Sequence, residues 1–265
     1  MQGLLYNREE LRERERMRDM NETTHRGLSA STLKIFAMAC MLLDHLWATV
    51  VPGNLWMTCV GRIAFPIFAF QVAEGYHKTR DLKAYAKRLF FWAIVTEIPF
   101  NLMAGGRLFY PVHQNVLWTF LIALVLIHWN EKARATQKRW VRILVAVGTV
   151  LLGMLVGLLT MVDYYHAGVL TVLVFYFFRK RTWWCRLAQL VLLWLINTEI
   201  LGGVGRDYVI FGHTFFLARQ SLAVLALIPI WLYRGEQGYH SKWFRYLCYG
   251  FYPVHLLVLG LAQML

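Results

Sequence analysis

The sequence predicts an all-α polytopic membrane protein of about nine transmembrane helices, with the amino terminus inside and the carboxyl terminus outside. Hydrophobic residues make up 58% of its 265 residues and charged residues 16%, whereas soluble domains average about 45–50% and about 25%. Apolar runs long enough to approach the ~20 residues that cross a bilayer recur along the chain. Lys and Arg concentrate in alternate loops between these runs. This composition excludes soluble, disordered and collagen-like chains.

The chain divides into a charged segment, residues 1–31, and a membrane domain, residues 32–265. The first segment holds six basic and six acidic residues that come before any apolar run. It is therefore not a signal peptide, and we expect it on the cytosolic side. The apolar runs that we interpret as spans are 33–51, 55–73, 87–104, 115–129, 141–159, 164–178, 186–201, 214–232 and 244–263.

The distribution of Lys and Arg tests this topology independently of hydropathy. One side of the predicted membrane holds 24 of the 28 basic residues, the other side holds Arg107 and Arg206, and the spans hold Arg62 and Arg219. The positive-inside rule then places the basic loops in the cytosol. Because the net charge of +13 follows these loops, we expect the lipid bilayer as a partner and no nucleic acid.

Ionisable residues inside the spans indicate a functional site, because they are costly in hydrocarbon. They are Asp44, His45, Arg62, Glu97, Arg219 and His255. Further polar residues at or near the outer ends are Asn101, Gln114, Asn115, Asp163, His166 and His213. At a rise of about 1.5 Å per residue, most of these groups fall between the middle and the outer half of the membrane. We therefore expect one polar chamber.

Helix geometry restricts the pairs within this chamber. Asp44 and His45 are adjacent and point about 100° apart, so a carboxylate that orients His45 must come from another helix, either Glu97 or Asp163. Arg62 needs an acidic partner, either Glu97 or Asp44. Each group also has a purely structural interpretation. The Arg62 ion pair could serve only to stabilise the fold, and His255 could be a packing residue. Arg219 and His213 also fit an ordinary membrane interface.

Basic residues at the inner end of the second span allow two interpretations. Lys78, Arg80, Lys83, Lys87 and Arg88 fit either an ordinary cytosolic loop or a basic opening that holds a phosphate-bearing ligand. The four cysteines have no metal-type spacing, and we expect no metal site.

Several segments carry a family resemblance. They are STLKIFAMACMLLDHLWATVVP, GRIAFPIFAFQVAEGYHKTRDLKAYAKRL and EIPFN, followed by HQNVLWT, DYYHAGVL and YPVHLLVL. In combination, from about residue 31 to 262, the chain resembles the TraX-like family, named for the F-pilin acetylase of conjugative plasmids. That family is similar to polytopic acyltransferases that take acyl groups from cytosolic coenzyme A thioesters. In that wider set a basic residue opens the first span and a histidine follows, positions held here by Lys34 and His45.

The resemblance implies that His45 is a catalytic base and acetyl-CoA the acyl donor, in a bacterial plasma (inner) membrane. We expect Glu97 or Asp163 to orient His45 and Arg62 or His255 to stabilise the oxyanion, with Asp44 in the same catalytic group as a candidate partner of Arg62. The donor phosphates would bind Lys78, Arg80, Lys83, Lys87 and Arg88. An amine or hydroxyl acceptor, such as a pilin or peptide amino terminus or an envelope glycan, would enter from outside near Asn101, Gln114, Asn115, His213 and Arg219. The alternative is a proton-coupled small-molecule transporter or flippase.

Overall fold

Short polar residues set the boundaries of the main helices. Helix α2 (Ala30–Thr49) follows Ser29, whose side chain accepts a hydrogen bond from the Thr32 amide at 3.2 Å. Asp81 caps α5 (Leu82–Gly105) in the same way, and Gly106 ends it in a left-handed conformation with φ 62°. Ser241 caps α11 (Lys242–Ala262). These side chains satisfy amide groups that the first helical turn leaves unpaired.

The computed structural model describes residues 27–134, 138–210 and 212–264, so most of the predicted segment 1–31 lies outside the described residues. The remaining helices are α3 (Leu55–Gly61), α4 (Ala64–Lys78), α6 (Val116–Arg134), α7 (Arg139–Leu159), α8 (Tyr165–Phe177), α9 (Trp183–Leu195) and α10 (Leu227–Trp231). A π-helical turn, η1 (Ile196–Ile200), continues α9, and a 3₁₀ segment, η2 (Arg219–Ala226), leads into α10.

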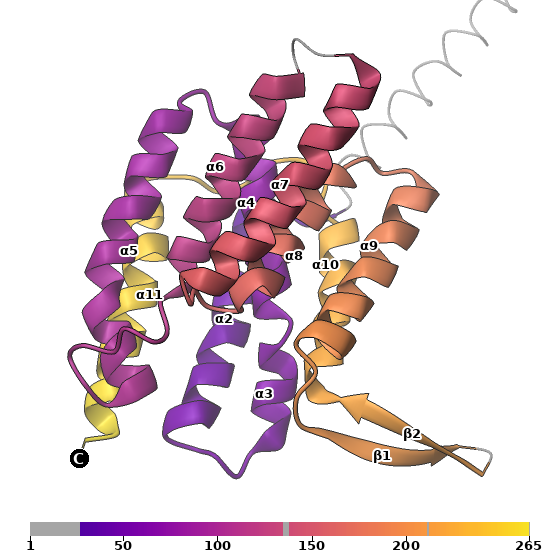
Figure 1. Cartoon of the computed structure of the whole chain (residues 1–265). Helices are drawn as coiled ribbons and strands as arrows, with labels where there is room; N and C mark the ends of the chain where they lie inside the picture. The colour runs from indigo at the N-terminus through magenta and orange to yellow at the C-terminus, as the bar shows by residue number, and fades with distance from the viewer. Residues whose placement is uncertain (1–26, 135–137, 211, 265) are drawn as a thin grey trace, which may run out of the picture.

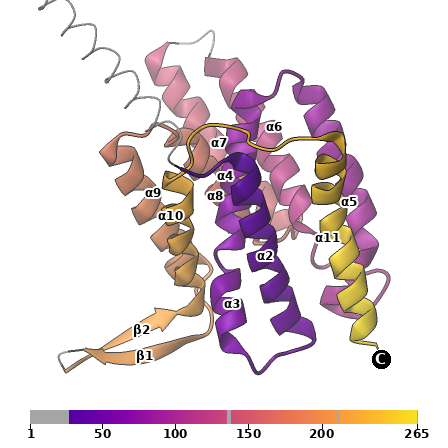
Figure 2. The ribbon, with the colours of Figure 1, turned by 180° about the vertical axis from the view of Figure 1, so that it is seen from behind.

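The helices form an antiparallel bundle whose two ends differ in character (Figures 1 and 2). The ends of α4, α6, α8 and α10 and the starts of α5, α7, α9 and α11 lie at one end of the bundle. We call it the basic end because most of the Lys and Arg of the described residues lie on these helix ends and in the described segments between them. The α2–α3 and α5–α6 connections lie at the opposite end. That end also carries a β-hairpin, and we call it the hairpin end.

Helix α8 forms the centre of the bundle. Val169 and Val172 are fully buried, and Leu173 and Phe175 are 1% exposed. Helices α4, α6, α7 and α9 all contact α8. A helix that is apolar on every side is buried in this way because it has no polar face to expose.

The outward faces of the bundle are apolar, as lipid contact requires. On α7, Ile143, Leu144, Leu151, Leu155 and Leu158 are all more than half exposed. Three helical segments in the described residues are long and apolar enough to cross a membrane: Leu55–Lys78, Val116–Arg134 and Arg139–Leu159. Two shorter apolar helices are Tyr165–Phe177 and Arg219–Trp231. The protein is therefore a largely helical membrane protein.

The second predicted span is interrupted. The run 55–73 becomes two helices, α3 and α4, with Arg62 and Ile63 between them. A Cβ on Gly61 would overlap the Asp44 side chain, so the glycine allows α3 to approach α2 closely at this point. Helix α3 packs on α2, whereas α4 packs on α2 and α8.

The predicted eighth span over 214–232 is wrong at its start, whereas the mostly helical architecture agrees with the predicted all-α membrane fold. Strands β1 (Gly205–Ile210) and β2 (His213–Ala218) form an antiparallel hairpin that projects from the bundle (Figure 1). Gly212 takes a positive φ of 80° at the turn, a conformation that favours glycine. Helical structure begins at Arg219 and ends at Trp231, because the apolar residues of β2 belong to a strand and not to the helix that follows.

Candidate active site

A pair of histidines joins α2 to α11. The Nδ1 atom of His45 lies 2.8 Å from Nε2 of His255, within hydrogen-bond distance. The two rings are stacked with centroids 5.0 Å apart. His255 is buried, at 8% exposure, while His45 is half-buried. The second ring nitrogen of His255, Nδ1, lies 2.6 Å from the carbonyl oxygen of Phe251.

The carbonyl of Phe251 determines which nitrogen of each ring carries the proton. A carbonyl oxygen only accepts, so His255 Nδ1 carries the donated hydrogen. In neutral His255 the Nε2 atom is then an acceptor, and His45 Nδ1–H donates to it. Neutral His45 is left with a lone pair on Nε2. This is the form that a general base requires.

An ion pair lies next to this histidine pair. Arg62 donates to the carboxylate of Asp44, to Thr58 Oγ1 at 3.2 Å and to the Thr58 carbonyl at 3.3 Å. Its Nη1 also donates to Gln220 Oε1 at 3.0 Å, and Gln220 in turn donates to Asn197 Oδ1 at 2.9 Å. The structure therefore selects Asp44 from the two predicted partners of Arg62. The guanidinium joins the α3–α4 break to η2 and, through Gln220, to η1.

Glu97 lies in a separate group at the α5–α6 contact. Its Oε2 accepts from Asn115 Nδ2 at 2.5 Å and from Trp118 Nε1 at 3.0 Å. Asn115 also donates to the Ala93 carbonyl at 2.9 Å. The structure does not bear out the expectation that Glu97 orients His45, since Glu97 turns to the start of α6 and His255 contacts His45 instead.

Asp163 is the carboxylate of a third group, in the segments that connect spans at the hairpin end. Its Oδ1 lies 3.2 Å from His113 Nε2 and accepts from the Tyr164 amide at 3.0 Å. The hydrogen bond that His113 donates to the Asp163 carboxylate raises the pKa of His113, although partial burial acts in the opposite direction. Asp163 is thus a partner of His113, and the expectation that it orients His45 is also not borne out.

The three groups lie near one another. His45 is within electrostatic range of Arg62, and Arg62 is within range of Asp163 and Tyr164. Several buried polar atoms of this layer have no partner among the described residues: Asp44 Oδ1, Trp47 Nε1, Thr96 Oγ1, Glu97 Oε1 and Asn101 Oδ1. Buried polar atoms are nearly always satisfied in proteins, so these atoms are suited to a bound substrate or to water.

The predicted acceptor residues separate into inner and peripheral positions. Asn101 is buried and donates to the Leu108 carbonyl at 3.1 Å. Gln114 donates to the carbonyl of Pro111 at 2.9 Å. Arg219 lies over the ring of Trp47, 5.3 Å from its centroid. His213 is exposed at the start of β2, away from the buried groups.

The residues predicted to bind the phosphates of the acyl donor differ in exposure and in their contacts. Arg80, Lys83 and Lys87 are exposed. Lys78 instead turns to Glu74 at 3.2 Å and to the Tyr233 hydroxyl at 2.7 Å. Arg88 is half-buried, with its guanidinium carbon 5.9 Å from the centroid of the Tyr85 ring. Within the described part of the chain, no three His, Cys, Asp or Glu side chains gather as a metal site requires.

Sequence reasoning missed three contributors to this polar layer. They are His113, Gln220 and Asn197. His113 stands in the HQNVLWT segment, directly before two residues that were selected. Gln220 and Asn197 are uncharged, and no single-sequence signal distinguishes them from the many polar residues at span ends.

Fold and site together define a helical membrane protein with paired histidines and an ion pair where its spans meet. Comparison with known proteins gives the family. The chain belongs to the TraX protein family, which matches residues 29–263.

Two curated relatives illustrate the range of this similarity. The chain is 26% identical over 251 residues to a probable fimbrial assembly protein, FimC of serogroup H1, from Dichelobacter nodosus, covering 89% of this chain and 96% of that protein. It is 30% identical over 146 residues to protein TraX of Escherichia coli, covering 54% of each chain. No solved structure matches the chain significantly.

Proposed function

We propose that this protein is a membrane-embedded acetyltransferase. It moves the acetyl group of cytosolic acetyl-CoA to an amine or hydroxyl acceptor at or beyond the outer side of the membrane. The observation that carries the proposal is the hydrogen-bonded chain from the Phe251 carbonyl through His255 to His45, which leaves a lone pair on His45 Nε2. Membership of the TraX family, with relatives named for fimbrial assembly, supports an acceptor such as a pilin amino terminus. An envelope glycan is the other acceptor class.

In this mechanism His45 is the general base. The acceptor nitrogen or oxygen attacks the thioester carbonyl carbon while His45 Nε2 takes its proton. The carbon–sulfur bond then breaks, and the proton passes to the departing thiolate of coenzyme A. His255 holds the reactive tautomer of His45 and is a positioning residue, a role that differs from the oxyanion role expected from the sequence.

Arg62 supplies the oxyanion donor. A guanidinium has five N–H groups, and its contacts with Thr58, Gln220 and Asp44 account for four of them. One N–H on Nη1 remains for the oxygen of the tetrahedral intermediate. Because the group is fixed by these contacts before reaction, it loses little freedom when charge develops.

Acceptor and donor enter from opposite ends of the bundle in this proposal. The basic end faces the cytosol, in agreement with the positive-inside rule. The hairpin end faces outward and presents Glu97, Asn101, Asn115 and Asp163 to the acceptor. Glu97 Oε1 and Asn101 Oδ1 are buried and have no hydrogen-bond partner among the described residues. Such oxygens suit an acceptor that itself donates hydrogen bonds.

Reconstitution of the protein in proteoliposomes tests this function. Acetyl-CoA labelled in its acetyl group is supplied at the basic end, and a pilin peptide or an envelope glycan fraction at the other. We expect the label to appear on the acceptor and free coenzyme A to appear on the donor side. Vectorial movement of a solute without consumption of acetyl-CoA would identify a transporter instead and refute the proposal.

A further inference from the structure

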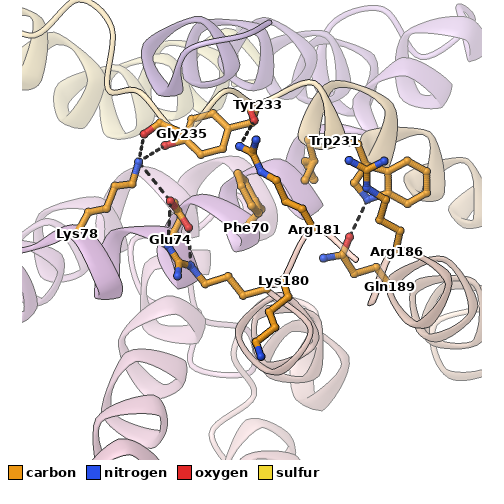
Figure 3. A pocket seen from close by; sticks show the side chains of 12 residues that line it. Phe70, Glu74, Lys78, Lys180, Arg181, Arg186, Gln189, Trp231, Tyr233 and Gly235 are labelled. Atoms are coloured by element: carbon orange, nitrogen blue, oxygen red, sulfur yellow. Dashed lines mark hydrogen bonds and ion pairs between the residues drawn. The ribbon is translucent and has the colours of Figure 1, made fainter. Parts of the chain in front are cut away.

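A basic cavity of about 400 Å³ lies at the basic end of the bundle, and neither histidine of the pair lines it. Figure 3 shows the side chains that line it. Its wall comes from α4, from the α8–α9 connection with the start of α9, and from α10 with the residues that follow it. Five basic side chains line it, against one carboxylate, Glu74. They are Lys78, Arg179, Lys180, Arg181 and Arg186. The lining therefore carries an excess of positive charge.

Internal contacts use some of these charges and leave others available. Glu74 pairs with Lys78 at 3.2 Å and with Arg179 at 2.8 Å. Arg181 donates to the Tyr233 carbonyl at 2.5 Å. Arg186 has only the ring of Trp231, 5.8 Å from its guanidinium carbon, and Lys180 has no ion pair with any described residue. These two side chains can meet an anionic ligand without breaking an internal ion pair.

Two further features suit a phosphorylated nucleotide. Helix α9 begins at Trp183, beside Arg181 and Arg186, and no side chain caps its amino terminus. Its first amide groups add partial positive charge that favours phosphate. Phe70, Trp231 and Tyr233 also line the cavity, and aromatic rings of this kind stack on nucleobases.

The cavity and the Arg62 network lie at opposite ends of the same three elements. On the cavity side, α4 carries Glu74, α10 carries Trp231 and α9 carries Gln189. On the other side, Arg62 precedes α4, Gln220 lies in η2, which leads into α10, and Asn197 lies in η1, which continues α9. Glu74 lies about 18 Å along the chain from Arg62 at a helical rise of 1.5 Å per residue. A ligand with a phosphorylated head and a long, narrow arm matches this arrangement.

We propose that this cavity binds the phosphate and adenine portion of the acyl-CoA donor, with its arm directed between α4 and η2–α10 towards Arg62. This rests on the proposed function and locates its donor site. Of the five donor-binding candidates from the sequence it keeps Lys78 and replaces Arg80, Lys83, Lys87 and Arg88. Lipid headgroups share the phosphate chemistry, so the test separates the two sources.

The test measures binding of coenzyme A to the full-length protein in nanodiscs of phosphatidylcholine alone. The double variant Lys180→Gln/Arg186→Gln is expected to raise the Kd at least about tenfold, since a charge-assisted hydrogen bond is lost at each position. Arg186→Lys, which keeps the charge, should recover part of the affinity. The matched control Lys132→Gln/Lys138→Gln removes two charges at the same end, from the last turn of α6 and the start of α7, and should change the Kd less than about twofold.

Three outcomes would overturn the inference. One is an unchanged Kd for Lys180→Gln/Arg186→Gln, and another is a larger loss for Lys83→Gln/Lys87→Gln than for the cavity variant. The third is a cavity variant that loses only co-purifying phosphatidylglycerol while its coenzyme A affinity is kept, which would identify a lipid site. Failure of the proposed function looks different: coenzyme A binds through the cavity, but no acetyl group is transferred.

Discussion

The paired histidines give the sharpest test of the proposed chemistry. His45→Ala removes the base, and general base catalysis contributes typically about 10²–10⁴ in rate. His255→Phe keeps a ring stacked near Phe251, with which His255 has a centroid distance of 4.6 Å. It removes the Nε2 acceptor, however, and leaves the Nδ1–H of His45 without its 2.8 Å partner. The two variants therefore separate the base from the group that positions it.

The structure sets the size of the second effect. Leaving a buried donor unsatisfied costs about 1–3 kcal/mol. If that whole cost falls on the reactive tautomer, kcat decreases by about 5- to 150-fold. Loss of His255 should thus be milder than loss of His45, and the KM for acetyl-CoA should stay close to that of the wild type because neither ring lines the basic cavity.

The assay is transfer of labelled acetyl from acetyl-CoA in proteoliposomes. His240→Ala is the matched control, because His240 is exposed and its one hydrogen bond to a described residue is with the Gly238 carbonyl, at 3.1 Å. Thermal unfolding in detergent checks that each variant is folded. Near wild-type turnover of a folded His45→Ala protein, or a larger loss for His255→Phe than for His45→Ala, would refute the assigned roles.

Three further predictions concern the residues around this centre. Arg62→Leu leaves the Asp44 carboxylate buried and unpaired, which should cost about 3–5 kcal/mol in stability, whereas Asp44→Leu/Arg62→Leu should recover most of the stability but no transfer activity. Gly61→Ala should lower the free energy of unfolding by about 1–3 kcal/mol, and the Tm with it, because the added Cβ would overlap the Asp44 side chain. Asp163 raises the pKa of His113, so this pair stabilises the protein fully below the unfolded pKa of about 6.5 and loses its effect as the pH rises through the folded pKa. The Tm deficit of His113→Phe should therefore be largest in acid.

Each of these predictions has a defined contrary result. Gly148→Ala is the control for Gly61→Ala, since a Cβ at Gly148 meets nothing within 4 Å. Equal Tm values for the two alanine variants would contradict the close approach of α3 to α2. Full transfer by the double leucine variant would show that the ion pair is structural only. A deficit of His113→Phe that grows with pH would contradict the sign of its pKa shift.

Sequence patterns predicted most of the helices but not the β-hairpin. Runs of about 20 apolar residues and alternating Lys and Arg are strong signals, because bilayer thickness and the membrane's charge asymmetry impose them. In the segment that contains Phe216 and Leu217, hydropathy does not distinguish strand from helix. The predicted span consequently began at 214, whereas helical structure begins at Arg219.

The sequence identified several residues of the candidate site but not which of them contact one another. Depth along a helix follows from residue number, and of the residues selected in this way the structure joins His45 to His255 and Asp44 to Arg62. Contact partners depend on how each helix rotates about its axis, which a single sequence does not give. His45 and His255 are 210 positions apart, so nothing local could show that an imidazole, and not the carboxylate of Glu97, would hold His45.

The turn that divides the second predicted span places an ion pair at the contact of several helices. In a continuous α-helix from Leu55 to Lys78, side chains three or four positions apart would share one face along the whole length. The break at Arg62 instead lets α3 stay on α2 while α4 continues against α8. The guanidinium then stands where these helices separate, with Asp44 on one side and Gln220 on the other. The Arg62 guanidinium therefore links α2, the α3–α4 turn and η2, and the Asp44 carboxylate compensates its charge within the bundle.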